Sequence, residues 1–311
     1  METGYEAFSF YYDQLTENVE YPQRAAYFHK LIQKYRQSEG VVLLDLACGT
    51  GSLSEEFAKL GYDVLGVDYS YGMLNQAMQK KLEHNLPIQY ICQDMRELDL
   101  YGTVDVTVCA LDSLNHLDSF SDVKTVFQQV FDVTEPGGVF LFDINTPYKH
   151  REVLGNQIYL YDTDDVYCVW ENQYEEPDNQ VTIQLHFFAR QEDDTYVRSE
   201  ECMTERAYPP EQVTAALQQI GWEVLGCYHA DTEEPLREDS QRMVFARVAY
   251  VIPNIVPTAA TAVMFSLLLN PSFGVIKIIY EKFGLDTTQV LNLFGNSKYA
   301  DRKSTRLNSS H

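Results

Sequence analysis

The sequence feature that most constrains the fold is an apolar strand that runs directly into a glycine turn and then a helix. Residues 41–47, VVLLDLA, form a nearly continuous apolar run, which is typical of a parallel strand buried on both faces. The turn CGTGS follows, and its glycines let the backbone approach a ligand closely. Residues 53–61, LSEEFAKLG, predict a helix closed by Gly61. A ligand site is expected where such a strand ends, at the carboxyl edge of a parallel sheet.

Strands and helices continue to alternate beyond this turn. Strands are predicted at residues 63–68, 88–94, 104–111 and 139–145, and helices at residues 22–37, 70–85 and 119–133. A Pro136-Gly137-Gly138 turn is expected before the fifth strand. After Thr146, three β-rich runs with polar turns predict an antiparallel meander, which is followed by a helix and two strands. The chain is therefore predicted to be an α/β protein with a Rossmann-like, doubly wound, mostly parallel sheet and an inserted antiparallel β-meander.

The charge of the chain limits its possible partners, and its cysteines indicate its cellular compartment. The 311 residues include 46 acidic and 23 basic ones, and this excess of negative charge disfavours nucleic acid and anionic lipid as partners. The six cysteines form no CxxC pair and no zinc-ligand spacing, so no metal site is predicted. The first residues, METGYEAFSFYYDQL, lack the basic start and apolar run of a signal peptide. We therefore expect free thiols and a cytoplasmic location.

The glycine turn carries a specific motif, Asp45-Leu-Ala-Cys-Gly49-Thr-Gly51, and Asp68 ends the next strand. A dinucleotide fingerprint would need a glycine where Ser54 stands. The motif resembles motif I, D-x-x-C-G-T-G, of the class I S-adenosylmethionine-dependent methyltransferases, and the resemblance covers about residues 5–247. The alternative is a nucleotide-binding α/β protein of another class.

The resemblance implies S-adenosylmethionine as the cofactor and a set of residues that bind it. Gly49 and Gly51 would line its methionine portion, and Asp68 would hold the ribose. Tyr69 and Met73 would flank the adenine, although Met73 is equally well explained as a core residue of its helix. The full set of predicted cofactor-binding residues is Tyr12, Asp45, Ala47, Gly49, Gly51, Asp68, Tyr69, Met73, Asp94, Met95 and Ala110.

Methyl transfer is an in-line displacement that needs alignment and, for some acceptors, removal of a proton. The loop after the fourth strand resembles the S-x-x-H stretch of small-molecule N-methyltransferases, with His116 as the candidate base or orienting donor. Asp112 in the same loop and Tyr11 near the N-terminus complete the predicted catalytic set. His116 could instead only begin the next helix. Trp170, Tyr174 and His186 in the meander could roof the substrate or simply pack in the sheet.

A methyltransferase domain is predicted over residues 1–248. Within it we expect N-terminal lid helices at 1–38, a cofactor-binding half at 39–146, the meander insertion at about 155–208, and a closing helix and strands at 209–248. The remaining residues have a different composition, because residues 251–311 carry three acidic and six basic residues.

Residues 249–300 resemble part of the membrane subunit of a sugar-type ABC importer, through P-x-x-x-P, LLLNP and FGVI elements. Residues 301–311, DRKSTRLNSSH, are similar to the translation of a common sequencing adapter. The two segments are therefore predicted to be a chimeric addition and an artefact. The alternative is a membrane anchor, but prolines at 253, 257 and 271 interrupt the apolar stretch, which is shorter than a membrane span.

These observations favour methyl transfer to a small-molecule acceptor through a nitrogen or oxygen nucleophile. Two alternatives remain: a tRNA or protein methyltransferase, and a regulator that binds S-adenosylmethionine without catalysis. The sequence assigns neither the acceptor nor the oligomeric state.

Overall fold

The computed structural model describes residues 6–249 and Lys282. The chain separates into two compact units, Met1–Tyr250 and Val251–His311. The permease-like segment, apart from Ala249 and Lys282, and the adapter-like segment lie outside the described residues. Among the described helices, none combines the length and the apolar character that crossing a membrane requires.

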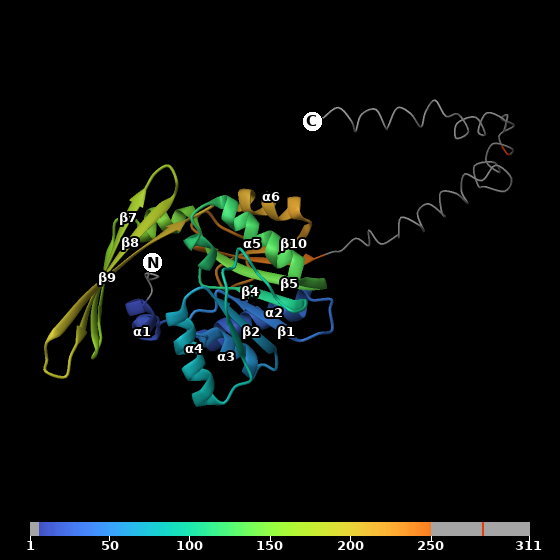
Figure 1. Ribbon diagram of the computed structural model, residues 1–311. Coiled ribbons are helices and arrows are strands. Elements are labelled where there is room, and N and C mark those ends of the chain that lie inside the picture. Colours follow the sequence, from blue (N-terminus) through green and yellow to red (C-terminus); the bar gives the residue numbers. More distant parts are fainter. Residues whose placement is uncertain (1–5, 250–281, 283–311) are drawn as a thin grey trace, which may run out of the picture. The chain divides into compact units, whose positions relative to one another are not determined.

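A seven-stranded sheet, sheet A, forms the centre of the first unit in the order β10–β11–β5–β4–β1–β2–β3 (Figure 1). Neighbouring strands among β1–β5 pair in parallel, and β11 is antiparallel to both β5 and β10. This topology confirms the predicted Rossmann-like, mostly parallel sheet. The strands are β1 (Val42–Leu46), β2 (Asp63–Asp68), β3 (Gln89–Cys92), β4 (Val104–Cys109), β5 (Thr134–Asn145), β10 (Trp222–His229) and β11 (Arg242–Ala249).

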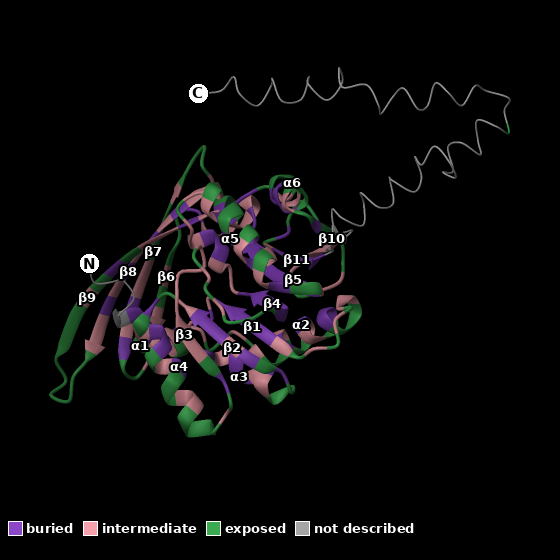
Figure 2. Ribbon diagram, turned by 45° about the vertical axis from the view of Figure 1, so that its right-hand side comes forward, coloured by how far each residue is buried: buried purple, intermediate pink, exposed green. Residues whose placement is uncertain are grey.

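Helices cover both faces of sheet A, and the buried side chains of its strands alternate between them (Figure 2). On one face, α5 (Phe120–Val133) and α6 (Pro210–Ile220) pack against strand residues such as Phe142. On the other, α2 (Tyr21–Tyr35) and α3 (Ser52–Lys59) pack against residues such as Leu141. Burying each such side chain contributes about 1.5–3 kcal/mol, so both faces stabilise the sheet. The helix α4 (Tyr71–His84) packs beside β2 and β3.

The Pro136-Gly137-Gly138 segment lies inside β5 rather than in a turn before it, which corrects the sequence-based prediction. The pairing of β4 with β5 shifts from Val104 opposite Thr134 to Val106 opposite Val139, so the segment is a bulge. Gly137 has a φ of 80°, and a Cβ on Gly138 would lie 2.8 Å from the Asp105 carbonyl oxygen. The two glycines therefore allow the strand to bulge without ending it.

The predicted meander is confirmed as a second, antiparallel sheet, sheet B, formed by β6 (Ile158–Asp162), β7 (Val166–Glu175), β8 (Gln180–Arg190) and β9 (Tyr196–Arg206). Its first run, expected as one stretch, makes two strands because polar residues after Asp162 form a turn. Alternation along the strands places Cys168 and Phe187 on a buried inner face. That face packs against α1 (Glu6–Leu15) through Phe8, whereas Glu171 and His186 lie on the outer face.

A buried carboxylate at the end of β5 joins three parts of the fold. Asp143 is fully buried and accepts hydrogen bonds from the backbone N–H groups of Leu111 and Asp112 at 3.1 and 2.8 Å. It also pairs with Arg24 of α2 at 3.0 Å and with Arg242 of β11 at 2.5 Å. Leu111 and Asp112 have φ values of 59° and 54°, which non-glycine residues rarely adopt. Asp143 therefore holds the loop after β4 in a strained conformation.

Replacing Asp143 by alanine should lower the free energy of unfolding by about 3–5 kcal/mol, because two largely buried arginines lose a shared partner. Denaturant unfolding followed by circular dichroism measures this loss. The control is Asp164→Asn in the exposed turn between β6 and β7, which should change stability by less than about 0.5 kcal/mol. Equal effects of the two substitutions would contradict the role assigned to Asp143.

Candidate active site

A cavity of about 260 Å³ opens where β1, β2 and β4 end, and α1 covers part of it. Nine of the predicted site residues line this cavity: Tyr12, Ala47, Gly49, Asp68, Tyr69, Met73, Asp94, Met95 and His116. Five do not: Tyr11, Asp45, Gly51, Ala110 and Asp112. Several lining residues were not predicted, including Phe8, Gln93, Arg96, Leu111 and Leu117.

The two glycines of the motif serve different purposes. Gly49 has a φ of 55°, and a Cβ there would meet nothing within 4 Å, so its backbone faces open space. Gly51 has a φ of 77° and caps α3, but a Cβ on it would lie 2.3 Å from the hydroxyl oxygen of Tyr90. A Cβ on Gly66 would likewise lie 2.5 Å from the Tyr90 ring. Gly49 is therefore the ligand-facing glycine, and Gly51 is needed for packing against β3.

Asp68 lies at the end of β2 with its carboxylate against the glycine turn. One oxygen accepts the Gly49 N–H at 2.8 Å, and the other accepts the Ser70 N–H at 2.8 Å. Burial raises the pKa of Asp68, while these backbone hydrogen bonds act to lower it. Each carboxylate oxygen keeps a second acceptor position. Asp68 can therefore still accept hydrogen bonds from a pair of ligand hydroxyls in the cavity.

Asp45, the first residue of the motif, lies beneath the turn instead of in the cavity. Its side chain is buried and accepts a hydrogen bond of 2.5 Å from the Ser54 hydroxyl. Burial raises the pKa of Asp45 to about 7, and the neighbouring Asp68 also raises it. The Asp45–Ser54 contact ties β1 to the start of α3 and so positions the turn.

Tyr69 and Met73, which were predicted to flank the adenine, both line the cavity, together with Asp94 and Arg96. Tyr69 is exposed, whereas Met73 is buried and also packs against α1 and sheet B. Asp94 makes an ion pair of 2.6 Å with Arg96, and the hydrogen bond from Arg96 lowers the pKa of Asp94. Arg96 was not among the predicted site residues. Its guanidinium occupies acceptor positions on both oxygens of Asp94.

The two tyrosines of α1 point in different directions. Tyr12 lines the cavity beside Phe8, with their ring centroids 5.2 Å apart. Tyr11 instead stacks on Phe187 of sheet B, with a centroid distance of 6.1 Å. The same helix is fastened to the glycine turn by Asp13, which accepts hydrogen bonds from Thr50 at 2.6 Å and Lys80 at 2.7 Å.

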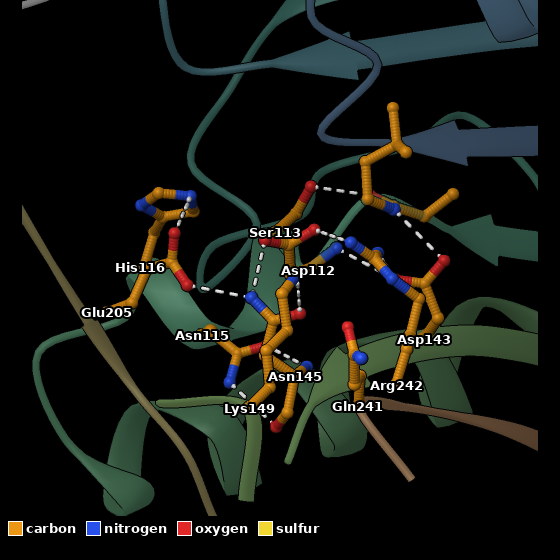
Figure 3. Close-up of polar contacts among 12 residues, drawn as sticks. Asp112, Ser113, Asn115, His116, Asp143, Asn145, Lys149, Glu205, Gln241 and Arg242 are labelled. Atoms are coloured by element: carbon orange, nitrogen blue, oxygen red, sulfur yellow. Dashed lines mark hydrogen bonds and ion pairs between the residues drawn. The ribbon is translucent and has the colours of Figure 1, made fainter. Parts of the chain in front are cut away.

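The loop after β4 supplies further residues of the site (Figure 3). Ser113–His116 form a short 3-10 helix that turns the His116 ring to the cavity. Asp112 lies behind it, 2.7 Å from the Arg242 guanidinium and 2.7 Å from the Asn145 amide nitrogen. Burial acts to raise the pKa of Asp112, but Arg242 and Lys149 together lower it.

Glu205 at the end of β9 completes this cluster and was not predicted, because it lies 89 residues beyond His116 in the meander. Its Oε2 accepts a hydrogen bond from the Asn145 amide at 2.8 Å and lies 3.3 Å from His150 Nε2. Its Oε1 lies 3.7 Å from His116 Nε2. Ligand atoms of Asp112, His116 and Glu205 lie within 4.8 Å of one another, a grouping that could hold a cation.

Comparisons with known proteins agree with this geometry. Residues 43–138 match the family described as "Methyltransferase domain". The chain is 30% identical to a methyltransferase of Geobacillus sp. (strain WCH70), and the match covers 78% of this chain and 98% of the relative. It is 31% identical to the methyltransferase YqeM of Bacillus subtilis (strain 168), and that match covers 78% of this chain and 95% of the relative. A solved S-adenosylmethionine-dependent methyltransferase from Clostridium acetobutylicum ATCC 824 is 31% identical, has a TM-score of 0.71, and covers 80% of this chain and 100% of its own. This chain therefore belongs to the class I S-adenosylmethionine-dependent methyltransferase family.

Proposed function

We propose that the first unit transfers the methyl group of S-adenosylmethionine to a small-molecule acceptor with a nitrogen or oxygen nucleophile. This proposal rests on one observation: residues suited to bind the cofactor and a candidate base line the same cavity. Asp68, the open Gly49 backbone and His116 all line this cavity. The cofactor, when bound, supplies an electrophilic methyl group on a positively charged sulfur.

The residues of the chain then have distinct tasks. Asp68 holds the ribose hydroxyls through its remaining acceptor positions. The rings of Phe8 and Tyr12 exclude water and present aromatic faces, which attract a sulfonium. His116 orients the acceptor or takes its proton, and Asp112 stands behind it.

A small acceptor fits better than tRNA or a protein. Residues 1–250 hold 43 acidic and 17 basic residues, so the surface field repels a phosphate backbone. In addition, α1 covers the cavity and is fastened by Asp13 on one side and by a hydrogen bond of 2.8 Å from the Phe8 N–H to Glu201 on the other. A regulator without catalysis would not need the His116 cluster.

We propose a cytoplasmic location as well, because none of the six cysteines forms a disulfide. The segments at 249–300 and 301–311 are proposed to be foreign to the enzyme. Strand β11 extends to Ala249, which pairs with Trp222, and this supports a junction close to this residue.

Asp68→Ala should weaken S-adenosylmethionine binding by about 1–3 kcal/mol, the contribution of hydrogen bonds to a charged group. Calorimetry measures this change, and thermal melting shows whether the fold is retained. Asp63→Ala, at the exposed start of the same strand, is the matched control and should leave binding unchanged. Unchanged affinity in Asp68→Ala would contradict the assignment, as would tight NAD binding to the unaltered protein.

His116→Ala should lower turnover about 100- to 10,000-fold without changing cofactor affinity, because the imidazole acts on the acceptor. Transfer of a labelled methyl group to an acceptor identified from a metabolite panel measures turnover. His84→Ala, a half-exposed histidine at the end of α4, is the control and should behave as the unaltered protein. Normal turnover in His116→Ala would leave the histidine with a structural role only.

Residues 1–250 alone should be soluble and should melt at the same temperature as the full chain, because they contain all seven strands of sheet A that the structure describes. Expressing both forms side by side and comparing their melting curves tests the chimera hypothesis. If the shorter form is insoluble or melts many degrees lower, the later residues belong to the fold.

A further inference from the structure

The carboxylate of Glu205 is buried, yet one of its oxygens has no hydrogen-bond donor among the described residues. The side chain is 6% exposed, and its Oε2 is held by Asn145 and His150. The neighbour of Oε1 is His116 Nε2 at 3.7 Å, which is too long for a hydrogen bond. A carboxylate oxygen has two acceptor positions, and the described residues donate to neither of them on Oε1. This oxygen is therefore available to a ligand that donates hydrogen bonds.

His150 helps to fix the orientation of the Glu205 carboxylate. The ring is fully buried, and its Nδ1 lies 2.8 Å from the Asn179 carbonyl oxygen, which can only accept, so Nδ1 carries a proton. Its Nε2 faces Glu205 Oε2 at 3.3 Å. The pair anchors Oε2 and leaves Oε1 directed at His116.

The cations nearby are already engaged. Arg242 is shared between Asp112 and Asp143. Lys149 donates to the Asn145 Oδ1 at 2.8 Å, and burial lowers its pKa. None of them donates to Glu205 Oε1, so the negative charge at this position is available to a ligand.

We propose, on the basis of the function proposed above, that the methyl acceptor is a primary or secondary amine, bound as its ammonium beside His116 Nε2 and Glu205 Oε1. An ammonium supplies two or three N–H donors and a positive charge to these two acceptors. A hydroxyl supplies one donor and turns its lone pairs toward the carboxylates, and a carboxylate acceptor would be repelled. The acidic surface of residues 1–250 also draws cations to the site.

The reaction then balances in protons and charge. The ammonium gives one proton to His116 Nε2, and the resulting imidazolium is stabilised by Glu205. The neutral nitrogen forms the bond to the methyl carbon, and the sulfur keeps the electron pair of the bond that breaks. The product is a methylated ammonium, which carries the charge that the sulfonium has lost. Glu205 is thus both a contact for the acceptor and a positioning residue for His116.

The test compares an amine with an alcohol of the same shape. Cyclohexylamine and cyclohexanol are titrated at neutral pH into the full chain saturated with S-adenosylhomocysteine, and binding is followed by ligand-observed NMR. We expect the amine to bind at least about tenfold more tightly, as a charge-assisted hydrogen bond provides. The preference should disappear in Glu205→Gln and persist in Glu171→Gln, an equivalent substitution on the outer face of sheet B.

A panel of amines and matched alcohols with methyl-labelled cofactor supplies a second readout. Methylation of amines alone would support the proposal. Equal binding of the two probes, absent amine binding, or methylation of alcohols that depends on added Mg²⁺ would overturn it. The comparison of probes in the unaltered protein stands even if Glu205→Gln folds poorly. Failure to bind S-adenosylhomocysteine would instead refute the proposed function itself.

Discussion

The buried carboxylate of Asp143 is the contact on which the catalytic half of the structure depends. Its two oxygens accept the backbone N–H groups that follow β4, and two arginines neutralise its charge. Without this anchor, Leu111 and Asp112 would have no reason to keep left-handed backbone conformations. The direction of His116, four residues after Asp112, follows from that loop. Asp143 thus links the stability of the fold to the geometry around His116, where the methyl acceptor is proposed to bind.

A second consequence of this anchor is the charge balance of the site. Arg242 bridges Asp143 and Asp112, so the arginine that stabilises the fold also keeps Asp112 ionised. Asn145 then donates one N–H to Asp112 and the other to Glu205. The cluster in Figure 3 is therefore a continuous network that joins sheet A to the base of sheet B.

Local patterns in the sequence were sufficient to predict sheet A, the meander and the cavity residues around Asp68. Strand β2 and the position of Asp68 follow directly from the order of apolar run, turn and acid. Side-chain direction was harder to predict. Tyr11 and Tyr12 are neighbours on one helix and so lie about 100° apart, which means that only one of them could face the cavity.

The residues around His116 were harder to predict, because their arrangement depends on contacts between residues far apart in the sequence. Asn145 meets Glu205 across 60 residues, and no local motif marks either residue. Asp45 and Gly51 match their motif, yet their roles are in packing beneath the turn. A motif identifies which residues cluster, but the neighbouring strands decide which of them reach a ligand.

Tyr90 of β3 shows how far such a neighbour can constrain the motif. Its ring occupies the space where a Cβ would stand on both Gly51 and Gly66. The glycine in the turn and the glycine in β2 are therefore required by a bulky residue on a third strand as well as by backbone geometry. Among related sequences, the three positions should change together: a small residue at the place of Tyr90 would remove the main clash of an alanine in β2 and leave the Cys48 sulfur at 3.1 Å, whereas the turn would still favour glycine because of its φ of 77°.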